Sequence, residues 1–337
     1  MPIAWLAGRH RVVGAPTVRT LADEDVAAAG RLLAARHRRH RLESPALDPV
    51  FEEPGAAQAE IEALLARPGS TAAVAVRDGR VCGFMVGVHR DETWGPNVWV
   101  EAAGHAAESA EDIRDLYAFL AGRWLGNGRT AHTALVPAAD AAGLDAWFRL
   151  GFGHQHVHAI VRTPALRDPD DPDVPDDPDA VSIRPAESRD VDELTRLDVL
   201  LPSHQAGSPV FSGLRVPTLA EAAADLDYLD DPRFVTFVAE LAGGVVGVVT
   251  GCSVDESASN SGLIRPPGAG FIAFAAVFPE ARGRGVGRTL ARTLLRWSAR
   301  EGHPTVAIDW RMTNLLSSRA WPALGFRPTF FRVHRRL

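Results

Sequence analysis

The chain has 337 residues, a formal net charge of −6 and two cysteines. Its length gives room for two domains with full cores, and so few cysteines argue against a disulfide framework and for a reducing compartment. The apolar run within residues 1–14 is too short for a signal peptide, and no segment approaches the length of a membrane span. The sequence therefore predicts a cytoplasmic protein with no membrane partner.

The first half of the sequence reads as a diverged copy of the second half, with a few extra residues in the second copy. The matched positions are Arg19 and Arg184, Asp25 and Asp190, Arg123 and Arg296, Trp124 and Trp297, Trp147 and Trp321, and Phe152 and Phe326. Self-similarity over such a length predicts two domains of the same fold. We place the first domain at 1–162 and the second at 181–337.

Three histidines alternate near the end of the first domain. His154, His156 and His158 occupy alternate positions of an expected strand, so they are predicted to share one face, about 7 Å apart at roughly 3.4 Å per residue. The ligands of one zinc ion lie at about 2.0 Å from it, which that spread does not permit. The histidines therefore predict a pocket lining or a surface between the domains, and no metal site.

Residues 163–180 consist almost entirely of aspartate and proline, with seven aspartates and one arginine. Charge and proline together oppose a packed core, so this segment is expected to be an extended acidic linker. Its balance of −6 equals the formal charge of the whole chain, which leaves both domains close to neutral. Without a globally basic face, the sequence predicts no nucleic-acid partner.

A glycine-rich turn follows an apolar run, 271–278, in the second domain. The turn reads Arg282, Gly283, Arg284, Gly285, Val286 and Gly287. Apolar side chains then recur at the spacing of a buried helix face, at Val286, Leu290, Leu294 and Trp297. Glycines at such a turn let backbone N–H groups close around phosphate oxygens, and the start of the helix adds the positive end of its dipole. The segment predicts a cradle for a nucleotide pyrophosphate.

A second pattern follows the next apolar run, 305–308. It consists of Asn314, Ser317, Ala320, Trp321, Gly325 and Phe326. Together with the glycine turn, it resembles the acyl-CoA signature of the GCN5-related N-acetyltransferases, the GNAT superfamily, over about residues 181–337. The resemblance implies an α/β fold of two tandem GNAT-like domains, each with a mixed, mainly antiparallel sheet flanked by helices. It also implies acetyl-CoA as the acyl donor and no metal.

The resemblance assigns the acyl-CoA contacts residue by residue. The expected set is the backbone of Ala275, Ala276 and Val277, the cradle and its flanks at Arg282, Gly283, Arg284, Gly285, Val286, Gly287 and Arg288, and the side chains of Asn314 and Ser317. Two interpretations stay open for the polar members. The arginines pair with phosphate oxygens or are solvated, and Asn314 contacts the donor, caps a helix, or does both.

The first domain lacks the residues that a phosphate cradle needs. The alignment places residues 109–114, which include Glu111 and Asp112 and no glycine, where the second domain has its turn. Two carboxylates would repel a pyrophosphate. Asp140 also stands in the place of Asn314. The first domain is therefore predicted to keep the fold without an acyl-CoA site.

Two positions that carry catalytic side chains in many members of the family are changed here. Trp321 stands where the family has a tyrosine thought to protonate the leaving thiolate, and an indole N–H cannot give up its proton. Ala273 stands where many members carry a glutamate. The remaining candidates are Asp309, close to the expected acyl group, and His204, near the expected acceptor pocket. The other interpretations are a solvated strand end and, because His40 is its counterpart, a structural histidine.

The predicted function is transfer of an acetyl group from acetyl-CoA directly to a primary amine of a small molecule, by a monomer or a homodimer. Asp255 and Glu256, in a loop of the second domain, hold a cationic acceptor or are solvated. A catalytically silent acyl-CoA-binding module is the alternative that the missing acid and base favour. The mycothiol synthases, which combine a degenerate first half with a competent second half, are a more specific alternative. The identity of the amine stays open, since a fold does not choose an acceptor.

Overall fold

The computed structural model describes residues 15–91, 95–164, 181–257 and 260–337. The predicted linker, apart from 163–164, and residues 1–14 lie outside the described part of the chain. The first repeat contains β1 (Thr17–Thr20), α1 (Val26–Glu43), α2 (Pro54–Leu65), β2 (Thr71–Arg77), β3 (Arg80–Arg90), β4 (Asn97–Val100), β5 (His105–Ala107), α3 (Ala110–Gly126), β6 (Ala131–Pro137), α4 (Ala141–Arg149) and β7 (Gly153–Arg162). The second contains β8 (Ser182–Pro185), α5 (Val191–Ala206), α6 (Leu219–Ala224), β9 (Phe234–Leu241), β10 (Gly244–Ser253), β11 (Gly270–Val277), α7 (Val286–Arg300), β12 (Thr305–Arg311), α8 (Leu315–Ala323) and β13 (Arg327–Arg336). Within the described residues, no helix has both the length and the apolar character that crossing a membrane requires.

Both repeats are α/β and share one order of elements, except that β4 and β5 of the first repeat correspond to the single β11 of the second. This confirms the two tandem domains of like fold predicted from the sequence. Each opens on the same ion pair: Arg19 Nη2 lies 2.8 Å from Asp25 Oδ1, and Arg184 Nη2 lies 2.8 Å from Asp190 Oδ1. The guanidinium groups hold the pKa of both aspartates below its usual value. Each aspartate also accepts a hydrogen bond from the backbone N–H three residues upstream, which closes the turn before α1 and α5.

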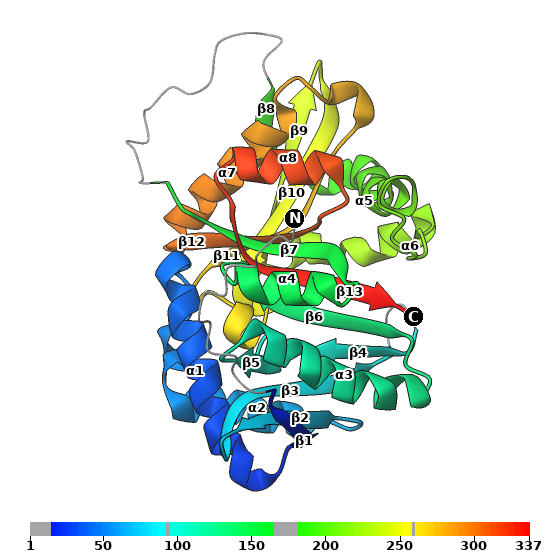
Figure 1. The fold of residues 1–337 in the computed structure, drawn as a ribbon. Coiled ribbons are helices and arrows are strands. Elements are labelled where there is room, and N and C mark those ends of the chain that lie inside the picture. The colour runs from blue at the N-terminus through cyan, green and yellow to red at the C-terminus, as the bar shows by residue number, and fades with distance from the viewer. Residues whose placement is uncertain (1–14, 92–94, 165–180, 258–259) are drawn as a thin grey trace, which may run out of the picture.

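The two repeats share one sheet. Its thirteen strands, among the described residues, follow the order β1-β2-β3-β4-β6-β13-β7-β12-β11-β10-β9-β8, with β5 paired to β3. At its centre the last strands are exchanged, because β13 lies between β6 and β7, and β7 lies between β13 and β12. Figure 1 shows the green β7 and the red β13 crossing the middle of the molecule. The last strand of each repeat therefore completes the sheet of the other. The domain boundaries placed from the sequence, at 1–162 and 181–337, stay predictions.

The exchanged strands obey an approximate two-fold symmetry. Ala134 of β6 pairs with Val333 of β13, and Ile308 of β12 pairs with Ala159 of β7. The alignment of the repeats makes Ala134 equivalent to Ile308, and Ala159 equivalent to Val333. Each exchanged strand therefore makes the same antiparallel register that it would make within its own repeat.

Helices cover both faces of this sheet. In the first repeat Phe84 packs beneath α1 and α2, and the adjacent Met85 packs beneath α3. In the second repeat Val248 joins the core beneath α5, and Val249 joins the core beneath α7. Successive side chains of a strand point to opposite faces, so each of these strands contributes to two cores. The loop after β10 adds Leu263 to the core of the first repeat, which ties the repeats together a second time.

Two neighbouring parallel strands separate in the second repeat. β11 and β12 pair at Phe271 and Ala307 and at the residues just before them, and their pairing ends there. β10 shifts register against β11 at the same level, between Thr250 and Gly251. Ala273, in the middle of β11, is exposed although its strand lies inside the sheet. The two strands thus enclose a gap that opens toward their C-terminal ends.

The helices α3 and α7 correspond to each other with an offset that differs by one residue from the offset in the sequence alignment. Leu116 of α3 packs over Gly83 of β3, and Leu290 of α7 packs over Gly247 of β10; a Cβ at either glycine would lie 3.2 or 3.1 Å from the leucine methyl. The matched contacts set the true register. The prediction that Trp124 corresponds to the tryptophan of α7 was wrong, since tight packing of leucine on glycine decides how the helix sits.

Candidate functional site

A cavity of about 420 Å³ lies beside the C-terminal end of β11, beyond the point where β11 and β12 stop pairing. It extends from the glycine turn before α7 to α8 on one side and to α5 on the other. Its lining includes these predicted residues: Ala275, Ala276, Val277, Arg282, Gly283, Gly285, Val286, Gly287, Arg288, Asn314, Ser317 and His204. Two others, Arg284 and Asp309, do not belong to it. The structure thus gathers residues from both sequence patterns around one space.

The glycine turn faces open space. Gly283 and Gly285 have φ of 78° and 83°, in the left-handed region that favours glycine. A Cβ at either position would meet no atom within 4 Å. The hydrogen-bond ladder of α7 begins where the N–H of Thr289 donates to the Gly285 carbonyl at 3.0 Å. The three amides before Thr289 therefore have no acceptor within the helix, and they give the turn the character of an anion site.

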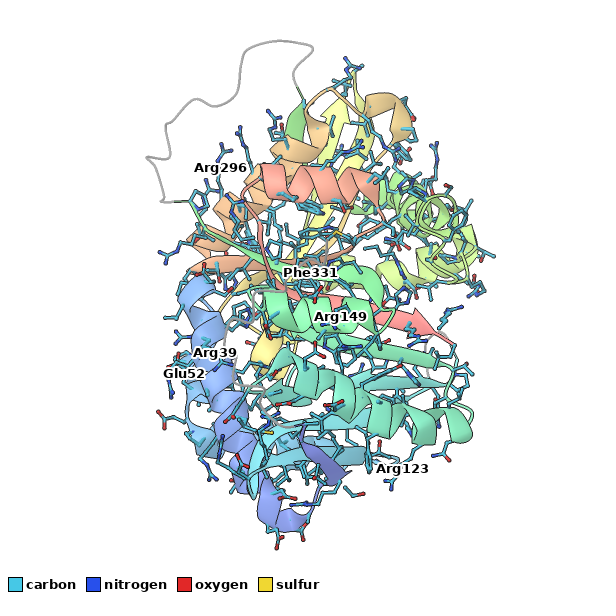
Figure 2. The ribbon with its side chains drawn as sticks, viewed as in Figure 1. Arg39, Glu52, Arg123, Arg149, Arg296 and Phe331 are labelled. Atoms are coloured by element: carbon cyan, nitrogen blue, oxygen red, sulfur yellow. The ribbon has the colours of Figure 1, made fainter. Side chains whose placement is uncertain are left out.

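The arginines around the turn differ in position. Arg282 donates through Nε to the Val277 carbonyl at 3.3 Å, which holds its side chain beside the end of β11. Arg288 lies in the first turn of α7 and lines the cavity, whereas Arg284 is exposed outside it. Arg296 is exposed farther along α7, near the edge of the molecule (Figure 2). Arg282 and Arg288 are thus the two arginines around the turn that line the cavity.

Asn314 caps a helix and also lines the cavity. Its Oδ1 accepts from the backbone N–H of Leu316 at 3.2 Å and of Ser317 at 3.4 Å, and its side chain is buried. Asp140 does the same for α4, where it accepts from the N–H of Gly143 at 2.9 Å. The exchange of asparagine for aspartate therefore keeps the cap and changes only the charge at the helix start.

Several lining residues lie outside the set that was predicted to contact acyl-CoA or to take part in catalysis. They are Leu200 and Leu201 of α5, Val248 and Val249 of β10, Ala281 before the turn, Leu290 and Ala291 of α7, and Leu316, Ala320, Trp321, Ala323 and Leu324 of α8. Leu200 and His204 lie one helical turn apart, and that spacing is the signal that was available for α5. Trp321 both lines the cavity and packs edge-on against Phe326, with the ring centroids 5.7 Å apart.

The equivalent strand end in the first repeat is occupied by a histidine. Met85 pairs with His105 as Val249 pairs with Ala275, so His105 stands in the place of Ala275. The His105 ring is buried and hydrogen-bonds through Nε2 to the Leu135 carbonyl at 3.0 Å, which bridges β5 to β6. Burial lowers its pKa to about 3, so the ring is neutral and Nε2 is the donor. The imidazole thus spans the gap that stays open in the second repeat.

An arginine completes the closure of this gap. Arg36 of α1 is buried and donates to the carbonyls of Ala102 and His105, which belong to the backbone that bends away from β6. Trp147 of α4 is fully buried with its ring centroid 5.9 Å from that of His105. Backbone groups that would face a pantetheine arm are therefore satisfied from within the protein.

The start of α3 carries acids that are already paired. Ser109 caps the helix, accepting from the N–H of Glu111 at 3.3 Å. Glu111 lies 2.5 Å from a guanidinium nitrogen of Arg149, which Figure 2 labels. Asp112 is buried and lies 2.6 Å from Arg77. The start of this helix thus carries two carboxylates, each of which is paired with an arginine.

The two candidate catalytic residues lie on different elements. Asp309, in β12, stands two residues beyond the last residue of its strand that pairs with β11, and Ala273 stands two residues beyond the last residue of β11 that pairs with β12. Its side chain is 22% exposed, and Oδ1 lies 2.8 Å from His156 Nε2. His204, in α5, is half-buried against the cavity. Its counterpart His40 is buried with its ring 4.7 Å from that of Phe330, so the two histidines have different surroundings.

The prediction that three histidines of β7 share one face was wrong for His154. β13 shifts register against β7 between Arg332 and Val333, so His154 pairs with Val333 and its ring packs on Phe331, at 4.5 Å between centroids. His156 and His158 stay together on the other face, 6.2 Å apart. A bulge thus breaks the alternation that the sequence suggests. Among the described residues, no group of three or more His, Cys, Asp or Glu side chains is arranged to hold a metal ion.

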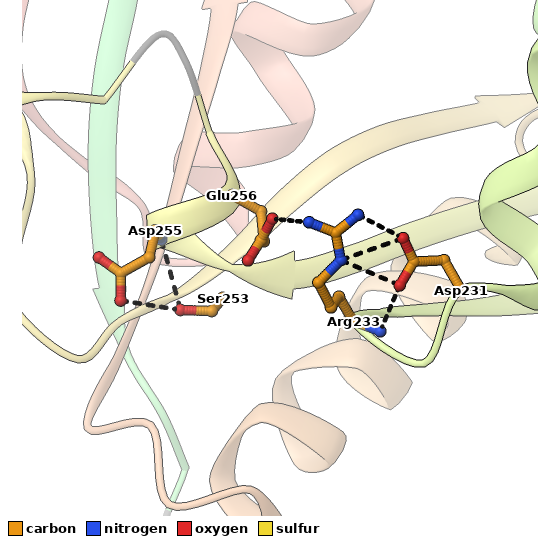
Figure 3. A network of polar contacts seen from close by, with 5 residues as sticks. All are labelled: Asp231, Arg233, Ser253, Asp255 and Glu256. Atoms are coloured by element: carbon orange, nitrogen blue, oxygen red, sulfur yellow. Dashed lines mark hydrogen bonds and ion pairs between the residues drawn. The ribbon is translucent and has the colours of Figure 1, made fainter.

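The loop acids of the second repeat are bound by arginines. Glu256 lies 2.8 Å from Arg233, and Arg233 also lies 2.5 Å from Asp231 (Figure 3). Asp255 accepts from Ser253 at 3.4 Å and lies 3.1 Å from Arg265. These carboxylates are neutralised by local partners, which leaves little charge on them for a cationic ligand.

Residues 208–326 match the family model of the acetyltransferase (GNAT) family. The second repeat is a GNAT domain. The match confirms the resemblance inferred from the two sequence patterns, and it identifies the chain as an acyltransferase that uses an acyl-CoA.

Two solved structures with TM-scores above 0.5 support the same fold over nearly the whole chain. A GCN5-related N-acetyltransferase from Sphaerobacter thermophilus is 16% identical, with a TM-score of 0.56 and 95% of each chain covered. A glucosamine N-acetyltransferase region in a fungal multi-domain β-N-acetylglucosaminidase is 15% identical, with a TM-score of 0.51, over 96% of this chain and 38% of that one. A tandem GNAT protein from the clavulanic acid pathway is 16% identical, with a TM-score of 0.46 and coverage of 95% and 98%. No curated protein sequence matches significantly.

Proposed function

We propose that the protein transfers an acetyl group from acetyl-CoA directly to a primary amine of a small molecule, and that only its second repeat binds the donor. The observation that carries this proposal is the cavity, which joins the open glycine turn to the gap between β11 and β12. The turn suits the pyrophosphate, and the backbone of β11 after Ala273, which pairs with β10 but not with β12, suits the pantetheine arm and the thioester.

The chemistry requires attack by the amine nitrogen on the thioester carbonyl carbon. A tetrahedral oxyanion forms, the C–S bond breaks, and the nitrogen loses a proton as the amide forms. In this proposal, backbone N–H groups at 274–277 stabilise the oxyanion. Asp309 and His204 are the candidates for holding the ammonium group and taking its proton, since they approach the gap from β12 and from α5.

The leaving thiolate has no dedicated acid at the position where the family has a tyrosine. Trp321 lines the cavity there, and an indole N–H donates a hydrogen bond without giving up its proton. A thiol with a pKa near the roughly 8.5 of cysteine departs as a thiolate without such help. Solvent then supplies its proton.

A catalytically silent acyl-CoA-binding module is the second candidate, favoured by Trp321 and Ala273 in place of the usual acid and base. Incubation with acetyl-CoA, a panel of primary amines and a free-thiol reagent separates the two functions. Amine-dependent release of thiol supports transfer. Binding of CoA with no thiol release from any amine supports the silent module.

Calorimetric titration with CoA tests the assignment of the donor site. We expect one CoA per chain, because His105 and Arg36 close the gap in the first repeat. A stoichiometry near two would show that the first repeat binds the donor as well, and the assignment would have to be abandoned.

A further inference from the structure

The strand exchange brings three polar side chains from both repeats into contact. Asp309 belongs to β12, His156 to β7 and Arg332 to β13, and these strands are successive neighbours in the sheet. His156 Nε2 lies 2.8 Å from Asp309 Oδ1, and Arg332 Nη2 contacts His156 Nδ1. A residue of the first repeat thus lies between two residues of the second, beside the gap in which the acyl group is expected.

The contacts determine which nitrogen of His156 carries the proton. A guanidinium group can only donate, so Nδ1 must accept from Arg332. Nε2 then bears the hydrogen and donates it to the Asp309 carboxylate. The result is a chain of hydrogen bonds that runs from Arg332 through neutral His156 to Asp309.

Burial keeps this histidine neutral. The pKa of His156 is lowered to about 4, first by desolvation and then by the positive charge of Arg332, against the opposing effect of Asp309. Other charged or titratable groups around this chain of hydrogen bonds are His158 on β7, Arg311 on β12, Arg90 on β3 and Glu101 after β4. His156 therefore donates to Asp309 throughout the neutral pH range.

The first repeat also holds Arg332 in place. Its guanidinium carbon lies 5.2 Å from the centroid of the Trp99 ring, and Arg90 lies over the same ring at 4.6 Å. Arg90 in turn lies 2.6 Å from Glu101. Arg332 is mostly buried, and burial lowers its pKa to about 10, so it stays charged at neutral pH. Packing and charge therefore fix the position of the Arg332 guanidinium group, which is the first hydrogen-bond donor to His156.

We propose that His156 is a positioning residue for the acceptor side of the transfer reaction: it fixes the Asp309 carboxylate, and the first repeat thereby contributes to a site that lies in the second. This inference rests on the proposed function. It assigns to the repeat without a donor site a specific task, delivered by its exchanged last strand.

Substitution of His156 tests the proposal. His156→Leu removes the donor to Asp309, and a hydrogen bond to a charged group is stronger than one between neutral groups. We expect kcat/KM for the amine to fall about 10- to 100-fold and the acidic limb of its pH profile to move to higher pH. His156→Gln, which can still donate, is expected to restore most of the activity and the wild-type profile. Affinity for CoA should stay unchanged in both, because His156 does not line the cavity.

His154→Gln is the matched control, since His154 lies on the same strand and packs on Phe331. It is expected to leave the pH profile and kcat/KM unchanged. If His156→Leu lowered only thermal stability, or moved the profile no more than His154→Gln does, the positioning role would be refuted.

A readout without catalysis separates this inference from the proposed function. Carbon-13 labelling of aspartate lets the Asp309 carboxyl be titrated by NMR, and nitrogen-15 labelling of histidine reports the tautomer of His156. We expect the Nε2–H tautomer, and an Asp309 midpoint that is higher in His156→Leu than in the wild type. An Nδ1–H tautomer or equal midpoints would overturn the inference, whether or not the wild type acetylates an amine.

Discussion

Gly285 is the residue on which the donor site most depends. Its φ is positive and its missing side chain faces open space, so Gly285→Glu adds both strain and a negative charge at the turn. We expect the Kd for CoA, measured by calorimetry, to rise more than about 100-fold, or roughly 2.7 kcal/mol, because the variant loses one or two charge-assisted contacts with the pyrophosphate.

A matched control separates strain from charge at the site. Gly302 follows the other end of α7, has φ of 82° and also faces open space. Gly302→Glu is expected to lower the unfolding midpoint to a similar degree and to leave CoA affinity unchanged. Equal losses of affinity in both variants would mean that strain, transmitted through the helix, explains the effect.

Trp321 occupies the position of the absent general acid. It lines the cavity and packs on Phe326, so we assign it a packing role. Trp321→Phe keeps most of that shape and is expected to lower kcat/KM by less than about tenfold, or roughly 1.4 kcal/mol, whereas loss of a true general acid costs about 100-fold or more. A larger loss with unchanged Tm and CoA affinity would show that the indole orients a reactant.

At the scale of elements, the exchange of β7 and β13 makes a prediction about cross-linking. Ala134 and Val333 face each other in neighbouring antiparallel strands, at a spacing of about 4.5–5.5 Å between Cα atoms that a disulfide can span. The double variant Ala134→Cys, Val333→Cys should therefore oxidise to a disulfide between the repeats, detected by peptide mass spectrometry.

The control for this cross-link uses the equivalent pair within one repeat. Ile308 would face Val333 if β13 stayed in its own domain, but in the exchanged sheet Ile308 faces Ala159. Ile308→Cys with Val333→Cys is thus expected to remain reduced. The reverse pattern of disulfides would mean that the strands are not exchanged in solution.

The sequence could not predict this exchange for a physical reason. β7 pairs with β12 in the register that it would make with β6 of its own repeat, and β13 pairs with β6 in the register that it would make with β12. The alternation of side chains is therefore satisfied by either partner. The equivalence of Arg19 and Asp25 to Arg184 and Asp190, by contrast, was visible in the sequence as one spacing that occurs in both repeats.

The residues of the candidate site could be predicted from the sequence only in part. The donor residues are close in sequence and carry a strong backbone requirement, which glycine reveals. The lining contributed by α5 and the partner of Asp309 come from distant segments. The only local signal for Leu200 is its spacing of one helical turn from His204, and His156 has no local signal that distinguishes it from an ordinary strand residue. The bulge that turns His154 away depends on the neighbouring strand and leaves no trace in local alternation.

For the whole molecule, buried histidines predict how stability depends on pH. The pKa is lowered to about 3 for His40 and His105 and to about 4 for His132 and His156, chiefly by burial. The unfolded chain, with histidine pKa near 6.5, binds more protons below that pH, so stability decreases as pH falls from about 6.5 toward 4. Each histidine contributes a slope of up to about 1.4 kcal/mol per pH unit.

Thermal unfolding between pH 8 and 5 measures this effect. We expect Tm to be nearly constant above pH 7 and to fall steeply below pH 6.5. His40→Leu, in which the buried ring beside Phe330 no longer titrates, should show a shallower fall over the same range. A Tm that declines equally in both proteins would remove His40 from the set of groups responsible.

The exchanged strands also determine how the molecule responds to dilution. Two separate chains, each one repeat long, that exchanged their last strands would form a dimer. This dimer would dissociate as the protein concentration decreases, because each exchanged strand would belong to a different molecule. Here the partner strand is tethered to the same polypeptide, so its effective concentration is set by the connection and not by the solution. The contact between His156 of β7 and Asp309 of β12 is thus expected to persist at any dilution, and separation of the exchanged strands should be unimolecular.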